Sequence, residues 1–457
     1  MPDSLHIVIA GSGPAGTATA LGLQKMGFAV TVVTSPRGFV ACEGISERVL
    51  QGLHNAGIRC ALDTIAPPSP RRASWNGLQS EANTERLVRR DHFDRALLKD
   101  LEGARIPVIH GRVSQIRSVE RGVSVSGTET GGEAFALHGA FFIDARGRSA
   151  PGGRQPRMRG PETVSLLQAW RGGPGEAQSA AISYAGGWAW MARFNDGSRY
   201  TQLTLAAEAV PAKPQLADFF FERLHQIEQA GPFHGGAAPA GELTARSATA
   251  ILCCDPIAGH TMRIGDAALA VDPLSGNGIF QSLSTALLAP RIINTVLKRA
   301  GSAELARQFY RERVNHAFMR FARMGRDFYQ QESRWPRETF WQQRQEWPDQ
   351  EPMHEPAAPD RLQIERRPVV SGDFISESDV VVTPDQPLGI WHLSGIELAP
   401  LVRALRQRQA QAQPLHSSGD VQEFLQGLLR QRDTEATAEQ LRALLAWLRA
   451  HQLLSPP

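Results

Sequence analysis

Cysteine is scarce in this sequence, with four residues among 457. Cys42, Cys60, Cys253 and Cys254 have none of the spacings typical of metal ligands, so we predict no metal centre. The adjacent pair Cys253 and Cys254 lies in an apolar run and is more typical of buried thiols than of a redox pair. These features favour a reducing, cytoplasmic location.

Long apolar runs and concentrated charge are also absent. No uninterrupted apolar run reaches the roughly 18 to 20 residues needed to cross a bilayer. The first residues, MPDSLH, pass into an apolar strand without the basic region of a secretory signal. The formal net charge is +3, and Lys and Arg are spread along the chain, which disfavours nucleic-acid binding. We therefore predict neither a nucleic acid nor a membrane as partner.

What is present first is a strand, a glycine-rich turn and a helix, in IVIAGSGPAGTATALGLQKMGFAVTVV. Gly11 permits the tight turn, Gly13 lets the backbone approach a pyrophosphate, and Gly16 lets the helix lie close to the strand. Pro14 and Ala15 belong to the same turn and open the helix, whose N-terminus favours phosphate. The strand on either side raises this match from weak to strong.

The acidic residue that usually holds the ribose is missing at the end of the second strand. The chain there reads Thr34-Ser35-Pro36-Arg37. A hydroxyl of Thr34 or Ser35 could substitute more weakly, and Arg37 is a further candidate for contact with the nucleotide.

Three later segments bear on which nucleotide is bound. LVRRDHFDRALLKDL predicts a helix, AFFIDARGRSAPGGR a buried strand followed by a turn, and MRIGDAALAVDPLSGNGIFQSLSTALLA a strand, a loop and a long helix. Each segment could be scaffold when taken singly. Their order and spacing resemble the FAD-dependent monooxygenase superfamily that shares the para-hydroxybenzoate hydroxylase fold and includes flavin-dependent halogenases and geranylgeranyl reductases.

The resemblance covers about residues 5 to 300 and implies the fold class. We expect an α/β protein with a Rossmann-like FAD domain, an inserted α+β substrate domain built on a β-sheet, and a small winged-helix-like domain at the C-terminus. The expected ranges are 1–60, 86–160 and 246–300 for FAD binding, and 61–85 and 161–245 for the substrate domain. A helical and linker region at 301–369 precedes the C-terminal domain at 370–457.

The resemblance also implies cofactor-binding residues. Arg90 would lie near the FAD pyrophosphate or the flavin edge, and Asp266 would bond the ribityl chain. Asp144 takes the place of the family's Asp-Gly motif, although Ala145-Arg146 follows it here and departs from that pattern. Val113 is a further cofactor-binding candidate.

The loop after Asp266 has too many small residues for an ordinary helix start. Small residues let backbone N–H groups approach a flat heterocycle and favour negative charge on a reduced flavin. The flavin candidates there are Pro273, Ser275, Gly276, Asn277 and Gly278. A turn-rich helix start would explain Pro273 and Gly276 but not the whole GDAALAVDPLSGNG string.

The segment ACEGIS, after the second strand, resembles a family segment that lines the flavin pocket. This makes Cys42, Glu43, Gly44 and Ile45 candidates for flavin contact, and Glu43 a catalytic candidate. The acid equally fits a solvated helix start, where the helix dipole favours negative charge.

Trp188-Ala189-Trp190 resembles the W-x-W pattern of halogenases, but Met191-Ala192-Arg193 follows instead of an isoleucine-proline pair. Halogenases also need a lysine beside the substrate, and this chain is poor in lysine. Trp188 and Trp190 point to one face of a strand and are candidates for either substrate pocket or sheet core. With Asn277 and Glu43 they complete the catalytic candidates.

The C-terminal extension suggests a short β unit and amphipathic helices, with Thr437 before a cap region. The motif GDAALAVDPLSGNG followed by such an extension resembles the subgroup of flavoproteins that make tryptophylquinone cofactors in amine dehydrogenases and amino-acid oxidases. The extension would be either a self-contained cap or a docking surface for a protein substrate.

We therefore expect a monooxygenase that uses FAD, dioxygen, and NADH, NADPH or a separate flavin reductase. The expected substrate is a peptidyl tryptophan in the small-subunit precursor of a quinone-cofactor enzyme. The alternatives are a hydroxylase of a free aromatic metabolite, a geranylgeranyl-reductase-like flavin reductase, a halogenase, and a flavin-binding assembly factor without turnover.

Overall fold

The computed structural model describes residues 5–152, 156–356, 358, 361–411, 418–431 and 435–454. The chain forms two compact units, one of residues 1–293 and 314–351 and the other of residues 294–313 and 352–457. Helices α6 (Gly278–Lys298) and α7 (Ala303–Gln330) therefore each contribute residues to both units.

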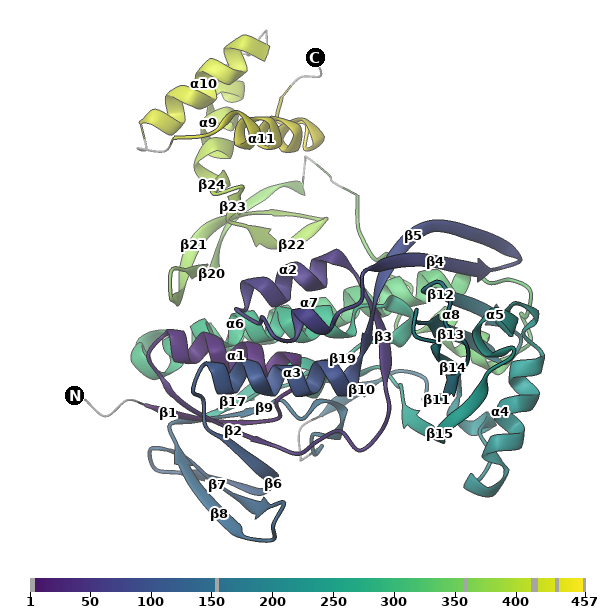
Figure 1. Ribbon diagram of the computed structural model, residues 1–457. Helices are drawn as coiled ribbons and strands as arrows, with labels where there is room; N and C mark the ends of the chain where they lie inside the picture. The colour runs from purple at the N-terminus through teal and green to yellow at the C-terminus, as the bar shows by residue number, and fades with distance from the viewer. Residues whose placement is uncertain are drawn as a thin grey trace. The chain divides into compact units, whose positions relative to one another are not determined.

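The first unit contains an eight-stranded sheet with the strand order β17-β18-β9-β1-β2-β6-β7-β8 (Figure 1). Strands β18, β9, β1, β2 and β6 run parallel. The strand bounds are Ile257–Ala258 (β17), Thr261–Arg263 (β18), Phe141–Asp144 (β9), His6–Ala10 (β1), Ala29–Thr34 (β2), Val108–Val119 (β6), Gly122–Glu129 (β7) and Ala134–Gly139 (β8).

The centre of this sheet is covered on both faces, because the apolar residues Ile7, Val8 and Ile9 of β1 are all fully buried. Helices α1 (Pro14–Lys25) and α3 (Arg90–Gly103) pack side by side. Gly22 of α1 lies so near Pro290 of α6 that a Cβ added there would be 2.8 Å from the proline ring. The absence of a side chain thus lets the two helices approach closely.

A second eight-stranded sheet has the order β15-β11-β14-β13-β12-β4-β5-β3. Its bounds are Ala238–Ser247 (β15), Thr163–Arg171 (β11), Ser198–Ala206 (β14), Gly187–Arg193 (β13), Gln178–Tyr184 (β12), Pro68–Trp75 (β4), Leu78–Arg89 (β5) and Cys42–Ile45 (β3). A three-stranded sheet joins β10 (Arg157–Arg159), β16 (Ile251–Cys253) and β19 (Leu269–Ala270).

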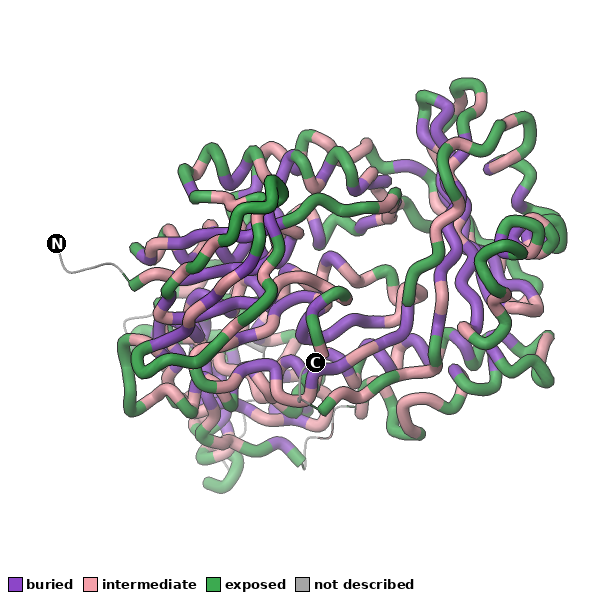
Figure 2. Tube along the Cα trace, turned by 90° about the horizontal axis from the view of Figure 1, so that it is seen from below, coloured by how far each residue is buried: buried purple, intermediate pink, exposed green. Residues whose placement is uncertain are grey.

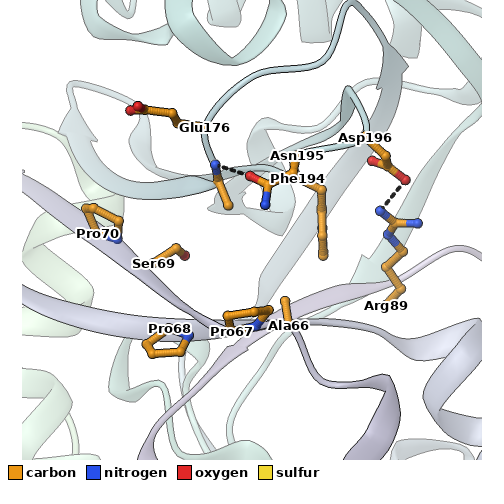
Figure 3. Close-up of a pocket in the computed structure, with 11 residues that line it drawn as sticks. Ala66, Pro67, Pro68, Ser69, Pro70, Arg89, Glu176, Phe194, Asn195 and Asp196 are labelled. Carbon is orange, nitrogen blue, oxygen red and sulfur yellow. Dashed lines mark hydrogen bonds and ion pairs between the residues drawn. The ribbon is translucent and has the colours of Figure 1, made fainter.

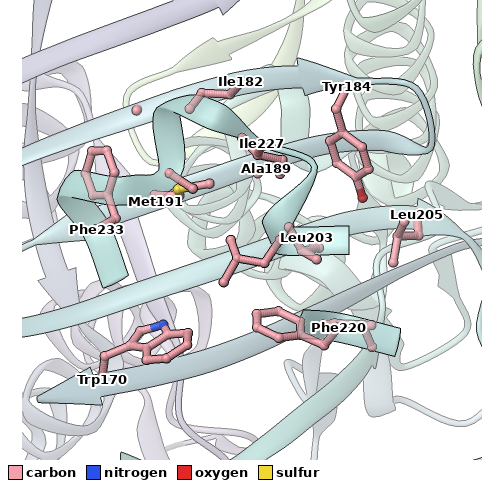
Figure 4. Close-up of a cluster of buried hydrophobic side chains, with 14 of the residues drawn as sticks. Trp170, Ile182, Tyr184, Ala189, Met191, Leu203, Leu205, Phe220, Ile227 and Phe233 are labelled. Atoms are coloured by element: carbon pink, nitrogen blue, oxygen red, sulfur yellow. The ribbon is translucent and has the colours of Figure 1, made fainter. Parts of the chain in front are cut away.

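The two faces of the second sheet carry different clusters, as the alternation of side chains along a strand requires. Ala189 and Met191 of β13 pack on one face with Phe220 of α4 (Leu216–His225) (Figure 4). Trp188 and Trp190 point to the opposite face, in a second buried cluster. The remaining helices of this unit are α2 (Glu47–Asn55), α5 (Gly231–His234) and α8 (Thr339–Glu346).

Besides its parts of α6 and α7, the second unit, as far as it is described, combines small antiparallel sheets with helices near the C-terminus. The sheets join β20 (Gln363–Ser371), β21 (Phe374–Thr383) and β22 (Gln386–Ile390), and β23 (His392–Leu393) with β24 (Ile396–Glu397). The helices are α9 (Leu398–Ala410), α10 (Ser418–Arg430) and α11 (Ala438–Ala450). Thr437 and Gln440 form a reciprocal capping box at α11, which confirms the predicted cap.

Buried, intermediate and exposed residues alternate along much of the chain (Figure 2), and the residues of β1 and β13 are almost all buried. In the part of the chain that the structure describes, no helix is long and apolar enough to cross a membrane. All four cysteines are free thiols, with Cys253 buried and Cys254 partly buried. The predicted α/β architecture is confirmed, while the residue ranges assigned to FAD and substrate binding stay predictions.

Candidate active site

Three of the predicted cofactor segments leave the parallel sheet at one edge. Ala10 of β1 pairs with Asp144 of β9, and Asp144 pairs with Arg263 of β18. The loops that follow Ala10, Asp144 and Arg263 therefore begin side by side. They are called the first, second and third loop below. The carboxyl edge of a parallel sheet is the usual place for a bound nucleotide.

The glycines of the first loop have distinct roles. Gly11 has φ +106, and a Cβ there would lie 2.4 Å from the backbone oxygen of Ala145. A Cβ on Gly16 would lie 1.9 Å from the backbone oxygen of Gly11. By contrast, no described atom lies within 4 Å of a Cβ added to Gly13. Gly11 and Gly16 are thus needed for packing, whereas Gly13 borders open space that a ligand can enter.

Helix α1 begins at Pro14, the residue after Gly13. No described side chain caps its N-terminus, and its first turn contains no acidic residue. The free N–H groups of the first turn and the helix dipole favour an anion such as a pyrophosphate. Ala15 is buried, and a Cβ added to Gly265 would lie 2.9 Å from its Cβ, so the first and third loops are in close contact.

At the end of β2, the hydroxyl of Thr34 is buried and lies 2.8 Å from that of Ser12. Ser35 is exposed, and Arg37 forms an ion pair of 2.9 Å with Asp94. Ser35 therefore remains the freer of the two hydroxyls proposed for the ribose.

Glu43 and Arg90 meet in a partly buried ion pair that the sequence did not reveal. The Arg90 guanidinium, 8% exposed, contacts the Glu43 carboxylate and lies 2.8 Å from Asp94. Burial lowers the pKa of Arg90, but the two carboxylates outweigh this effect and raise it. Arg90 stays charged, and the predicted catalytic acid Glu43 is already paired.

Strand β3 places Cys42, Gly44 and Ile45 against β5. Burial raises the pKa of the Cys42 thiol well above its usual range, so this cysteine is not an activated nucleophile. A Cβ on Gly44 would lie 2.0 Å from a carboxylate oxygen of Glu85, and Trp190 Nε1 donates to Glu85 at 3.2 Å. Gly44 thus makes room for a carboxylate that holds the Trp190 ring.

The second loop is closed by an ion pair of 2.8 Å between Asp144 and Arg146. Arg146 also donates to the backbone oxygen of Val113 at 3.3 Å, which explains how Val113 comes near this loop. Asp144 is thereby fixed beside the first loop, next to the end of β1.

The third loop begins with Asp266, whose carboxylate lies 3.5 Å from Arg148. Loss of surrounding water raises the pKa of Asp266, and Arg148 only partly opposes this effect. The side chain still leaves 30% of its surface open. A carboxylate that has lost part of its water shell is stabilised by a hydrogen bond from a neutral hydroxyl group. A ribityl chain carries such hydroxyl groups.

The predicted flavin loop, residues 272–278, is open on one side. Pro273 starts a short 3-10 turn, Gly276 follows at φ +61, and α6 begins at Gly278. A Cβ added to Gly276 or to Gly278 would have none of the described atoms within 4 Å. The Asn277 amide donates to the backbone oxygen of Ser275 and holds the turn. The loop therefore offers backbone and open space together, as a flat ring requires.

The other side of this loop is held by a hydrogen-bond chain absent from our predictions. Asp272 accepts the Leu274 N–H at 2.9 Å and the Tyr329 hydroxyl at 3.0 Å. Trp188 Nε1 donates to the same hydroxyl at 3.2 Å. Burial raises the pKa of Asp272, and burial and Asp272 together raise that of Tyr329. This chain links the loop to the second sheet.

Trp188 and Trp190 thus belong to the sheet core and hold polar groups with their indole nitrogens. Trp188 is 3% exposed and Trp190 is 9% exposed. Leu274 of the flavin loop packs against the same cluster, as does Cys42 of β3. The face of the second sheet that bears the two tryptophans is therefore the face that meets the predicted flavin segments.

These arrangements fit FAD: an uncapped helix end faces open space for a pyrophosphate, a carboxylate is placed for a ribityl chain, and a glycine loop is free for the ring. Fold and site together define a flavin-dependent oxidoreductase.

Comparison with known proteins agrees with this class. No family model matches the chain. Curated relatives include a tryptophan 2-halogenase from Chondromyces crocatus, 23% identical over 78% of this chain and 72% of the relative. A digeranylgeranylglycerophospholipid reductase from Methanococcoides burtonii is 23% identical over 70% of this chain and 81% of the relative. The solved structure of the halogenase CmlS matches with a TM-score of 0.75 at 17% identity, covering 99% of this chain and 96% of that one, and supports the fold.

A solved structure of much higher identity is QhpG, a peptidyl tryptophan dihydroxylase essential for tryptophylquinone cofactor biogenesis. It is 44% identical with a TM-score of 0.83, over 99% of this chain and 100% of that one. The present chain belongs to the QhpG family of FAD-dependent monooxygenases.

Proposed function

We propose that this protein hydroxylates the indole ring of a tryptophan within a polypeptide, as a step in the making of a tryptophylquinone cofactor. The observation that carries the proposal is the 44% identity over 99% of the chain to a peptidyl tryptophan dihydroxylase.

In this proposal the glycine loop binds FAD through backbone groups. The first turn of α1 receives the pyrophosphate, Asp266 accepts a ribityl hydroxyl, and the backbone around Gly276 and Gly278 lies along the ring. Arg90 stays charged in its ion pairs with Glu43 and Asp94 and holds these two carboxylates in place. Bound FAD supplies the redox chemistry by accepting electrons and activating dioxygen.

Electrons come from NADH or NADPH, either at this protein or through a separate flavin reductase. The indole needs no base to become nucleophilic, so the pairing of Glu43 with Arg90 does not weaken the proposal. What the protein adds is position and the exclusion of water at the face of the second sheet.

The partner in the proposal is the small-subunit precursor of a quinone-cofactor enzyme. The C-terminal domain, residues 370–457, helps to dock it. Removing this domain by truncation would be a poor test, because Thr295 and Asn294 of α6 bond to backbone groups of Ile375 and Asp373. Point substitutions on exposed positions of α10 and α11 are the cleaner approach.

Halogenation is the second candidate, because halogenases are among the relatives. The four lysines of the sequence disfavour it: Lys25 lies on α1, Lys99 on α3, Lys298 on α6, and Lys213 in a short turn before α4. No strand of the second sheet, as described, carries a lysine.

Intact-mass analysis tests the function. A tryptophan-bearing small-subunit precursor is incubated with the FAD-loaded protein, NADH, a flavin reductase and dioxygen, in chloride buffer. We expect one or two oxygen atoms on the precursor, labelled when ¹⁸O₂ is supplied, and no addition when its target tryptophan is phenylalanine. Chlorine on the product would establish halogenation instead. Oxygen on free tryptophan but not on the precursor would establish a metabolite hydroxylase.

A further inference from the structure

The second sheet opens between two of its neighbouring strands. β4 begins at Pro68 and β12 at Gln178, yet they pair only from Arg71 with Ser179 to Ser74 with Ile182. One residue earlier, the ladder would place Pro70 opposite Gln178. Pro67, Pro68 and Pro70 lack the N–H that a ladder needs, so the parallel pairing stops there.

A groove of about 380 Å³ lies where the strands separate (Figure 3), within the roughly 300 to 1,000 Å³ of ligand pockets. Its lining residues are Ala66, Pro67, Pro68, Ser69, Pro70, Arg89, Glu176, Ala177, Phe194, Asn195 and Asp196. One wall is the proline segment, and the opposite wall is the turn after β13 with the residues before β12.

The groove combines apolar walls with a small number of polar groups. Phe194 faces the proline wall, and the Arg89 guanidinium lies 4.2 Å from its ring centre. Arg89 is itself paired with Asp196 at 2.6 Å. Asn195 accepts the Ala177 N–H through its side-chain oxygen at 2.7 Å, which leaves its NH₂ group to donate. Phe194 is only 7% exposed, so only a small part of its ring borders the groove. The exposed prolines offer the flat apolar surface against which an aromatic side chain can lie.

The charge of the groove selects against anionic ligands. It carries two carboxylates, Glu176 and Asp196, and one guanidinium, Arg89, which is already paired. Burial raises the pKa of Asp196, but Ser198 and Arg89 outweigh it and lower the pKa, so this carboxylate stays charged. A dinucleotide would meet net negative charge, whereas a neutral or basic peptide would not.

The groove lies on the side of the sheet that meets the predicted flavin segments. Phe194 belongs to the same buried cluster as Trp190 and Cys42, and Leu274 of the flavin loop packs against that cluster. Arg89 of the groove pairs directly with Cys42 across β5 and β3.

We propose that this groove binds the tryptophan-bearing segment of the polypeptide substrate, with the indole lying against the exposed prolines of β4. The inference rests on the proposed function and names the place where the substrate enters. Asn195 and the carboxylates offer a donor and acceptors to the peptide backbone and the indole N–H.

Blocking the groove tests the inference. In Ala177→Trp a large ring fills the groove, whereas Ala134→Trp adds the same ring at an exposed position of β8. The probe is a capped seven-residue peptide with one central tryptophan, and its analogue has alanine there. Calorimetric titration of the FAD-loaded protein should give at least ten-fold weaker binding for the alanine peptide, and for the tryptophan peptide with Ala177→Trp. Ala134→Trp should bind like the wild type.

A second variant guards against misfolding. Glu176 is exposed, so Glu176→Lys should fold normally and reverse the charge at the rim. It should shift the preference from lysine-flanked to glutamate-flanked tryptophan peptides by several-fold.

Unchanged tryptophan-peptide binding by Ala177→Trp, equal binding of the tryptophan and alanine peptides by the wild type, or an unaltered flank preference would each overturn the inference. Oxygen addition to the precursor is measured separately on the wild type. If the wild type hydroxylates the precursor but the groove variants bind the peptide normally, the proposed function stands and the groove inference is wrong. If the groove binds the peptide as expected but no hydroxylation occurs, the groove inference stands and the proposed function is wrong.

Discussion

Tyr329→Phe removes a single hydroxyl at the junction between the flavin loop and the second sheet. That hydroxyl donates to Asp272 at 3.0 Å and accepts from Trp188 Nε1 at 3.2 Å, and the tyrosine is 2% exposed. Its loss leaves the indole N–H buried without a partner and leaves Asp272 with the Leu274 N–H.

The expected cost follows from these two groups. A buried donor left unpaired costs about 1 to 3 kcal/mol, and a hydrogen bond to a charged group contributes a further 1.5 to 3 kcal/mol. Because Asp272 keeps one partner and the two effects overlap, we expect a loss of about 2 to 4 kcal/mol in the free energy of unfolding. The flavin loop should also lose its fixed position.

Urea unfolding of the FAD-free protein measures the stability, and the visible absorption and midpoint potential of bound FAD report on the loop. Tyr184→Phe is the matched control, because the Tyr184 hydroxyl is buried without a hydrogen-bond partner among the described residues. Its removal should be neutral or slightly stabilising. Equal stability changes in the two variants, or a flavin spectrum and potential unchanged by Tyr329→Phe, would refute the reasoning.

Three further outcomes follow from single positions. Gly16→Ala should prevent correct folding of the first loop. Gly13→Ala should fold normally, as measured by circular dichroism, yet bind FAD at least ten-fold more weakly. Tight FAD binding by Gly13→Ala would contradict the proposed position of the pyrophosphate. The pKa of Asp266 is raised in the folded protein, so the wild type is most stable when this group is protonated and loses stability as the pH rises above the ordinary value of 3.8. Asp266→Asn cannot ionise, so its stability relative to the wild type, measured by urea unfolding, should increase from about pH 4 to 7. A difference that became smaller over this range would contradict the prediction. Thr437→Ala should cost about 1 kcal/mol, with Thr437→Ser retaining most of the stability, and equal losses would exclude the capping box.

The elements that sequence predicted best depend on neighbours along the chain. The glycine loop, the strand before it and the helix after it obey local rules of φ, packing and helix ends, and the structure contains each of them. The capping box at Thr437 is likewise complete within four residues. Such features need no knowledge of distant contacts.

Other predictions identified the right residues but not their surroundings. Glu43 and Arg90 were separate candidates, and folding joined them across 47 positions into one ion pair. Trp188 and Trp190 were ambiguous between pocket and core, since alternation indicates a shared face but not what covers it. Their burial and their bonds to Tyr329 and Glu85 place both rings in a core cluster, while their role at the substrate pocket stays a prediction.

The sequence by itself therefore determined the nucleotide loop, because that loop is a short pattern with strict steric requirements. The expectations of a flavin and of tryptophan modification came from the resemblance of the sequence to known flavoproteins. Only the tertiary structure decided that Tyr329 holds Asp272, 57 positions away, and that prolines near residue 68 separate β4 from β12 to form a groove beside Phe194. Those contacts arise from the pairing of distant strands, whose partners no local pattern specifies.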